Sequence, residues 1–125
     1  MADAFHHAVS SARKFGGHFN DYMPIHAWFD ETKAHMPDFR HRALRHHSEG
    51  IALAIRLFGP VIHRQDGSST PTRFVAEQHV QEDCGCIPTA ADWLRNLNVA
   101  TQPWMLRGAR RLSRELETTA PGSET

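Results

Sequence analysis

The segment DFRHRALRHHSEGIALAIRLFG, residues 38–59, decides the fold that the sequence predicts. Asp38 is a typical N-cap residue and the Gly-Pro pair at the end is a strong stop signal, so about five turns of helix fit between them. At about 100° per residue, one broad face of this helix collects the apolar side chains, which are Phe39, Ala43, Leu44, Ile51, Ala54, Ile55, Leu57 and Phe58. Arg40 and His47 fall in the middle of that face, where an unpaired charge would be very costly. We therefore expect both residues to have partners inside the fold, and we expect function at this point.

A shorter helix is predicted on the N-terminal side of this segment. Pro24 is a typical first residue of a helix over residues 24–35, and the break at Met36-Pro37 pairs that helix with the long one as an αα-hairpin. Residues 2–15 predict a further short helix that stops at Gly16-Gly17. Its polar side chains make it either a frayed terminus or part of a site.

The pattern changes after the long helix. Residues 61–75 are typical of a short β-hairpin around a turn at Asp66-Gly67, or of an irregular loop. Residues 75–83 predict a short helix that Gly85 closes. The next helix begins at an approximate capping box formed by Thr89 and Asp92. Its expected core residues are Trp93, Leu94 and Leu97.

The predicted fold class is mostly α, a small helical domain with one short β-hairpin. At 125 residues the chain is long enough for one core but not for two. We expect residues 1–105 to form a single compact domain and residues 106–117 to form a peripheral Arg-rich helix or interaction arm. Residues 118–125 predict a disordered tail.

Composition excludes some classes of function and favours others. Fourteen basic and fourteen acidic side chains cancel, which argues against nucleic acid or a charged membrane surface as the partner. No apolar run approaches a membrane span and the N-terminus lacks the apolar segment of a signal peptide, so we expect a cytoplasmic protein. Cys84 and Cys86 are too close in sequence for a good disulfide, in keeping with cytosolic thiols. The unusual feature is the ten histidines.

Histidines and carboxylates recur in several segments and predict a metal site. The sequence has no phosphate loop, GxSxG, HExxH or paired CxxC motif. We expect His47 to share a metal with residues from other segments, and the candidate ligands are His7, His46, His47, Glu77 and His79. These donors suit zinc, iron, manganese or nickel, and the sequence does not choose among these divalent transition metals. The alternative for His47 is a hydrogen-bonded core histidine.

Other residues are expected to support the metal ligands. Asp30 lies one turn after His26, and a carboxylate beside an imidazole fixes its tautomer, although such a pair is equally common at a surface. The residues predicted to stand behind the ligands are His26, Asp30, His41, Glu49 and Asp83. Arg40 is expected to pair inside the fold with Asp30, Glu77 or Asp83.

A second set of polar residues predicts an anion site. The candidate anion-binding residues are Ser10, Lys14, Lys33, Arg40 and Arg45. Phosphate is the obvious anion, and Trp28 or Trp93 could stack on a base or a sugar. Arg42 is assigned instead to the solvated face of the long helix.

Four blocks of the chain resemble, in order, those of a small uncharacterised protein family found in phages, prophages and bacteria. These blocks are HHAVSSARKFGG, IHAWFDETKAH, DFRHRALRHHSEG and EQHVQEDCGCIPTAADWL, and the resemblance covers about residues 5–105. The family has no assigned activity, so the resemblance implies motif positions and no mechanism. Those positions are His6, His7, His26, Asp30, Lys33, Arg40, His41, Arg45, His46, His47, Glu49, Glu77, Gln78, His79 and Asp83. Members of the family carry a leucine near Cys84, which argues against a shared cysteine ligand, and the Arg-rich segment after Leu106 lies outside the resemblance.

Two functions of different classes agree with these patterns, and whether the protein is an enzyme stays open. The first is a divalent-metal-binding domain with hydrolytic chemistry on a phosphorylated small molecule, in which the metal activates water and arginines hold the anion. The second is a non-catalytic binder, phage-encoded by the resemblance, that captures a nucleotide-like ligand or a host protein. A structural protein whose histidines only fill core and surface is a third alternative, and a homo-oligomer is open in each case.

Overall fold

The structure, a computed structural model, describes residues 3–97 and 100–108 of the chain. Within these residues six α-helices and one two-stranded antiparallel sheet confirm the predicted fold class, mostly α with a short β-hairpin. The elements are α1 Ala4–Phe15, η1 Phe19–Asp21, α2 Met23–Asp30, η2 Glu31–Ala34, η3 Phe39–His41, α3 Arg42–Arg45, α4 Ser48–Phe58, β1 Val61–His63, β2 Ser69–Pro71, α5 Thr72–Cys84, α6 Ala90–Asn96 and η4 Pro103–Leu106, where η denotes a 3₁₀ turn. The predicted Arg-rich helix and tail lie outside the described residues from residue 109 onward.

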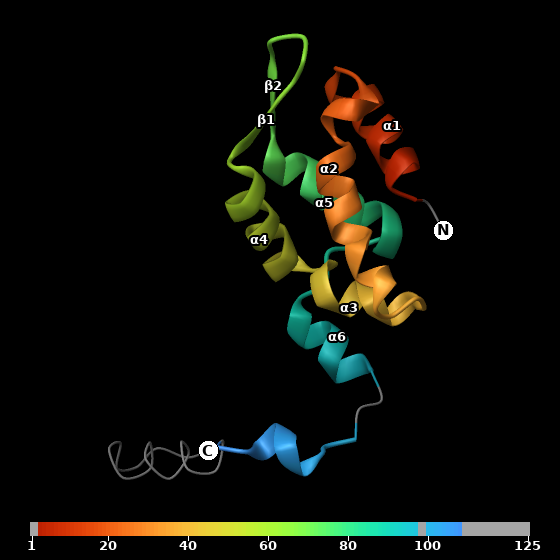
Figure 1. The fold of residues 1–125 in the computed structure, drawn as a ribbon, viewed down its shortest axis with the longest axis vertical. Helices are drawn as coiled ribbons and strands as arrows, with labels where there is room; N and C mark the ends of the chain where they lie inside the picture. Colours follow the sequence, from red (N-terminus) through yellow and green to blue (C-terminus); the bar gives the residue numbers. More distant parts are fainter. Residues whose placement is uncertain (1–2, 98–99, 109–125) are drawn as a thin grey trace, which may run out of the picture.

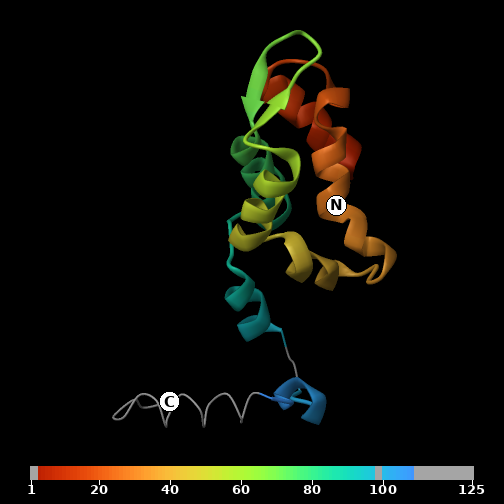
Figure 2. The ribbon, with the colours of Figure 1, turned by 60° about the vertical axis from the view of Figure 1, so that its left-hand side comes forward.

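Helix α5 lies at the centre of the helical body (Figure 1). Helices α1, α2 and α4 pack against it, so both arms of the expected helical hairpin, α2 and α4, share α5 as a neighbour. Helix α6 packs beside the short α3, and η4 lies beyond α6, away from the other helices (Figure 2). The β-hairpin joins α4 to α5 and pairs Ile62 with Thr70. Among the described helices, none combines the length and the apolar character needed to cross a membrane.

The core of the domain has an apolar part and a histidine part. The apolar part consists of side chains from α1, α2, α4 and α5, with the largest of them being Tyr22, Ile25, Trp28, Phe29, Ile51, Val75 and Val80. The histidine part consists of five fully buried rings, those of His7, His26, His41, His46 and His79. Buried polar groups need hydrogen bonds or a cation to offset the loss of water, so the histidine part requires partners of its own.

The prediction of one continuous helix over residues 38–58 is wrong, because the chain breaks between α3 and α4. The backbone of His47 is extended, with φ −162° and ψ 173°, and its Nδ1 accepts the N–H of Gly50, so its side chain caps α4. A Cβ atom on residue 50 would lie 1.8 Å from the carbonyl oxygen of Arg45. Glycine is therefore needed where the two helices approach each other.

The break also changes which side chains of this region are buried. Arg40 was predicted to be buried, but its side chain is 58% exposed and its Nη2 pairs with Asp38 at 2.8 Å on the surface. Phe39 and Leu44, assigned to the apolar face, are also exposed. Arg42 was predicted to face solvent, and its side chain is only 17% exposed. The assignment of faces fails because a period of about 100° per residue holds only within one unbroken helix.

Several helix ends lie where the sequence predicts them, because their signals are local. Gly16 ends α1 with a φ of 89°, and Gly85 ends α5 in the left-handed conformation. Thr89 and Asp92 form the predicted capping box of α6. Helix α5 is longer than predicted, because it begins at Thr72, directly after β2.

Helix α6 buries less apolar surface than predicted. Leu94, an expected core residue, is 66% exposed. Trp93 is half-buried, and its indole N–H donates to the carbonyl oxygen of His46 at 2.8 Å. Helix α6 is thus attached to the break between α3 and α4 largely through Trp93.

Candidate metal centre

Four side chains from three segments converge on one point in the histidine part of the core. Asp30 is the last residue of α2, and His46 lies in the break between α3 and α4. His79 and Asp83 are one turn apart on α5, so both extend from the same face of that helix. Each of the four offers one nitrogen or oxygen atom, and these atoms lie within 4.8 Å of one another. This group can therefore hold a metal ion.

The distances between the four donor atoms fit a single ion. His46 Nε2 lies 3.1 Å from His79 Nε2 and 3.0 Å from Asp83 Oδ2. The distance from His46 Nε2 to Asp30 Oδ1 is 3.6 Å. His79 Nε2 lies 3.3 Å from Asp30 Oδ1 and 3.3 Å from Asp83 Oδ2. Donors at about 2.0–2.2 Å from a tetrahedral ion are about 3.3–3.6 Å apart, so these distances approximate the edges of such a tetrahedron.

Asp30 lacks hydrogen-bond donors although its carboxylate is buried. Neither of its oxygens has a hydrogen-bond partner within the described residues, and Lys33 Nζ lies 3.9 Å from Oδ2, beyond hydrogen-bond distance. Burial alone would raise the pKa of Asp30, but the imidazoles of His46 and His79 hold that pKa below its usual range, so the carboxylate is ionised. A buried ionised carboxylate without donors is costly, and a cation at this point would compensate it.

Asp83 is held in place from several sides. Its Oδ2 faces the centre, its Oδ1 lies 3.1 Å from His7 Nε2, and its backbone carbonyl accepts a hydrogen bond from Arg42 Nη1 at 3.1 Å. Burial alone would raise the pKa of Asp83, but His46, His7 and His79 hold that pKa far below its usual range. Asp83 is therefore ionised, with one carboxylate oxygen fixed toward the centre.

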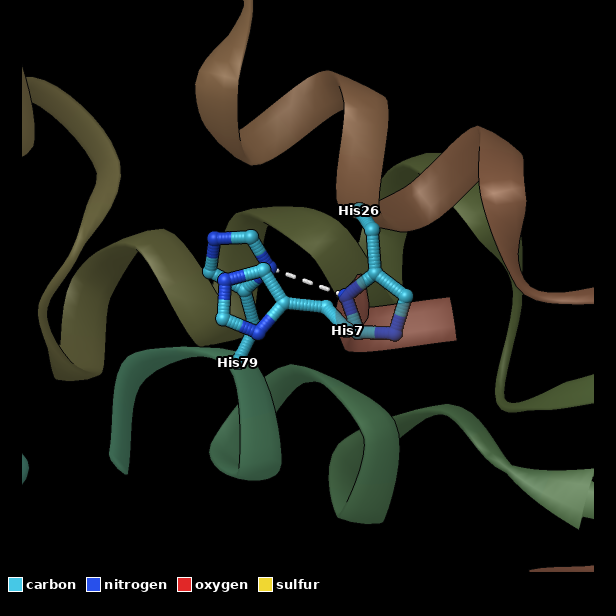
Figure 3. A group of neighbouring side chains, drawn as sticks. All are labelled: His7, His26 and His79. Atoms are coloured by element: carbon cyan, nitrogen blue, oxygen red, sulfur yellow. Dashed lines mark hydrogen bonds between the residues drawn. The ribbon is translucent and has the colours of Figure 1, made fainter. Parts of the chain in front are cut away.

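A chain of hydrogen bonds orients His79 from behind. Its Nδ1 lies 2.8 Å from His26 Nδ1, the dashed line in Figure 3, and His26 Nε2 lies 2.7 Å from the hydroxyl of Ser11. Burial, followed by the neighbouring His79 and His7, lowers the pKa of His26 to about 2, so this ring is neutral. A neutral His26 that donates from Nε2 to Ser11 accepts at Nδ1 from His79. A His79 ring that donates from Nδ1 directs Nε2 toward Asp30 and Asp83, so Nε2 is the atom placed to bind a cation.

His7 lies against His79 and His26 and supports Asp83 (Figure 3). Its Nδ1 is 2.8 Å from Glu82 Oε1, and its Nε2 faces Asp83. Burial alone would lower the pKa of His7, but these two carboxylates raise it above its usual value. One nitrogen from each of the three rings in Figure 3 lies within 4.8 Å of the other two, so these rings form a second group that can hold an ion. Because both nitrogens of His7 and of His26 already have partners, the group around Asp30 is the better candidate.

One family model matches the chain over residues 2–105, and its description is Domain of unknown function (DUF6915). The chain belongs to this family. No curated protein and no solved structure matches the chain. The match agrees with the resemblance to an uncharacterised family, whereas occurrence in phages and prophages stays a prediction. The family assigns no function to this DUF6915 domain, so the evidence for a metal ion comes from the distances between the donor atoms.

Three of the five predicted metal ligands of the DUF6915 domain lie at or beside the centre. His46 and His79 face it, and His7 supports Asp83. Asp30 and Asp83, which the sequence placed behind the ligands, belong to the group itself. The spacing of His79 and Asp83, four residues apart on one helix, is the signal that identifies this half of the site.

The other two predicted ligands lie elsewhere. Both nitrogens of His47 have partners, since Nδ1 accepts the N–H of Gly50 at 2.9 Å and Nε2 lies 3.1 Å from the carbonyl oxygen of Ala43. This is the alternative of a hydrogen-bonded core histidine. Glu77 points away from the centre and lies 3.9 Å from Arg73 on the outer side of α5.

Two further residues predicted to support the ligands have different positions. His41 is fully buried, its Nδ1 lies 2.7 Å from the carbonyl oxygen of Asp38, and its ring stands edge-on to His46 with 5.6 Å between centroids. Glu49 lies outside the centre, where its carboxylate accepts the N–H of Ala90 at 2.9 Å and links α4 to α6.

The residues predicted to bind an anion do not converge on one site. Ser10 donates to Glu82 at 2.6 Å, and Lys14 lies 3.4 Å from the same carboxylate. Burial alone would raise the pKa of Glu82, but hydrogen bonds from Ser10, Gln78 and His7 lower it to about 2. Glu82, which was not among the predicted site residues, joins Ser10 and Lys14 to His7 on the outer side of the centre.

The arginines are also distributed differently from the prediction. Arg45 donates to the carbonyl oxygen of Trp28 at 2.6 Å, and its guanidinium carbon lies 4.4 Å from the centroid of that ring. Arg40 pairs with Asp38 at the surface. The arginine that reaches the centre is Arg42, whose Nη2 lies 3.9 Å from Asp83 Oδ1. Arg42 was predicted to face solvent as part of one continuous helix, and the break in that helix turns it inward.

Proposed function

We propose that this protein binds one divalent transition-metal ion through Asp30, His46, His79 and Asp83. The observation that carries the proposal is the buried carboxylate of Asp30, which has no hydrogen-bond donor among the described residues and lies 3.3 Å from His79 Nε2. Two ionised carboxylates close together in a buried place repel each other, and a divalent cation between them neutralises both charges.

Zinc is the ion that this donor set favours. Two imidazole nitrogens and two carboxylate oxygens are common zinc ligands, and zinc prefers the tetrahedral arrangement that the distances approximate. Iron, manganese and nickel accept the same donor types, usually with additional ligands. The hydrogen bond between His79 and His26 supports each of these ions equally, because it fixes the tautomer of a ligand histidine.

The chemistry that we propose for the bound ion is hydrolysis of a phosphorylated small molecule. An ion held by Asp30, His46, His79 and Asp83 would supply a water molecule of lowered pKa at neutral pH. Attack of that water on phosphorus would release the alcohol and inorganic phosphate. Arg42 has the role that the sequence analysis assigned to Arg40 and Arg45, because it is the arginine beside Asp83 and can hold a phosphate near the ion.

The second candidate is a non-catalytic binder of a nucleotide-like ligand or a host protein, in which the ion only stabilises the fold. Four protein ligands, two of them fully buried histidines, are typical of structural zinc sites, and this observation favours the second candidate. A phosphorylated compound that is recovered unchanged after incubation with the metal-loaded protein indicates binding, and a hydrolysed compound indicates catalysis.

Elemental analysis of untagged protein, purified without chelator, tests the metal proposal. We expect about one transition-metal ion per chain in the wild type and a small fraction of that in Asp30→Asn and His79→Gln, because each loses one ligand. His6→Gln is the matched control, since His6 is an exposed histidine at the surface of α1. Metal at background level in the wild type, or equal metal in all four proteins, would contradict the proposal.

A further inference from the structure

A pocket of about 550 Å³ lies beside the metal centre and shares Asp83 with it. The pocket is formed by the end of α5, the loop that follows and α6, together with Arg42 from α3. A volume of a few hundred cubic ångströms is typical of sites for small organic molecules. A space large enough for a small molecule therefore lies next to the candidate centre, with Asp83 common to both.

The lining of the pocket combines one cation with an apolar wall. Ile87, Pro88 and Trp93 form the wall, and Arg42 lines the pocket next to Asp83. The Nε atom of Arg42 is buried and has no hydrogen-bond partner within the described residues. The Arg42 side chain is still 17% exposed and lines the pocket, so its guanidinium is suited to an anionic group that enters.

The wall of the pocket is attached to the segment that carries the metal ligand His46. Trp93 donates its indole N–H to the carbonyl oxygen of His46 at 2.8 Å. The N–H of Ser48 donates to the carbonyl oxygen of Pro88 at 2.9 Å. These two bonds fix the wall relative to the centre, so the pocket is preformed.

The acidic residues of the pocket decide when an anion can enter it. Asp92 caps α6 and pairs with Arg95, which offsets its charge. The charge of Asp83 would repel an anion, unless a cation at the centre neutralises it. Binding of an anion in this pocket should therefore depend on the metal.

We propose that this pocket binds an aromatic phosphate monoester, with the ring against Ile87 and Trp93 and the phosphate beside Arg42 and the metal centre. The proposal rests on the proposed function, because the metal supplies the positive charge that offsets Asp83. The pocket proposal adds the class of substrate, and it adds the residues that distinguish this substrate from inorganic phosphate. The apolar wall accounts for the ring, and the partly exposed guanidinium of Arg42 accounts for the phosphate.

Calorimetric titration of the zinc-loaded full chain with phenyl phosphate and with inorganic phosphate tests this inference. We expect phenyl phosphate to bind about tenfold or more tightly than inorganic phosphate, because its ring leaves water for the apolar wall. Ile87→Trp should remove this difference by filling the pocket, and Ile87 is exposed enough for the variant to fold. Arg42→Gln should weaken both ligands by about tenfold or more, since a charge-assisted hydrogen bond is lost. Arg40→Gln, a surface arginine outside the pocket, should bind both ligands like the wild type.

Zinc content is measured for every protein, so that the two proposals are judged separately. If the wild type takes up zinc but binds phenyl phosphate no better than inorganic phosphate, the pocket proposal is overturned and the metal proposal stands. If Ile87→Trp keeps its zinc and the full preference for phenyl phosphate, the ring does not bind against this wall. Failure of the wild type to take up zinc would overturn both proposals.

Discussion

His46 Nε2 and His79 Nε2 lie 3.1 Å apart in the core, and both face the carboxylate oxygens of Asp30 and Asp83. Two neutral imidazoles can share one proton between these nitrogens, but this arrangement leaves Asp30 without a donor. A single divalent cation satisfies all four donor atoms at once, because each of them can direct a lone pair at the same point. This relationship is the physical basis of the metal proposal.

Arg40 of η3 and Arg42 of α3 should contribute differently to stability. Arg42→Ala should lower the free energy of unfolding by about 1–3 kcal/mol, because the half-buried carbonyl oxygen of Asp83 loses a charged donor. Arg40→Ala should cost about 0–1 kcal/mol, because it removes an exposed ion pair with Asp38. Urea unfolding of the two variants measures both values. Equal midpoints, or a larger loss for Arg40→Ala, would contradict the burial of Arg42.

Gly50→Ala should strongly destabilise the protein, although alanine normally stabilises a helix by about 0.5–1 kcal/mol relative to glycine. The new Cβ would meet the carbonyl oxygen of Arg45 at 1.8 Å, so α3 and α4 would have to move apart. That movement would also displace His46, and the variant should lose metal together with stability. Thermal melting gives the sign of the effect, and a higher melting temperature in Gly50→Ala would show that the close approach of the two helices is absent.

The sequence predicts the helix ends and the fold class well, because these depend on neighbouring residues. Gly16, Gly85 and the Thr89-Asp92 pair act within one turn of chain, and the structure has them in the predicted roles. The break at His47 depends on how closely α4 approaches Arg45, a relationship in space that periodicity does not contain. The assignment of Arg40 and Arg42 to faces failed as a consequence of this break.

The part of the candidate centre that depends on neighbouring residues of one helix was predictable from the sequence. His79 and Asp83 share a helix, so their convergence follows from a spacing of four residues. Asp30 and His46 come from other segments, and only the packing of α2 and the break at α4 brings them to α5. The sequence indicated the correct residue types in several segments, whereas the choice of His46 over His47 depends on the backbone of two adjacent residues.

Chelator-treated protein should lose stability in acid because His26 is buried and neutral. The pKa of His26 is lowered from 6.5 to about 2 in the folded state, so only the unfolded chain takes up this proton as the pH falls below about 6.5. The stabilising contribution is present above pH 6.5 and is lost below it, at up to about 1.4 kcal/mol per pH unit. The raised pKa of His7 has the opposite sign, since its contribution is present below the unfolded value and is lost at higher pH.

Comparison of His26→Gln with the wild type separates the effect of His26 on stability from that of His7, because both proteins contain His7. We expect the free energy of unfolding of the variant to fall less steeply between about pH 6 and pH 4.5 than that of the wild type. The readout is the slope against pH, so a constant loss of stability in the variant does not matter. Parallel slopes would show that His26 is not a buried neutral histidine.

X-ray absorption spectroscopy of the zinc-loaded protein tests the central claim most directly. The proposed ligands predict four nitrogen and oxygen atoms at about 2.0–2.2 Å, with the outer scattering of two imidazole rings and no sulfur. The two cysteines are the competing ligands, since Cys84 and Cys86 line the adjacent pocket as free thiols. A sulfur shell at about 2.3 Å, or a shell of oxygen alone without imidazole scattering, would contradict a centre made by Asp30, His46, His79 and Asp83.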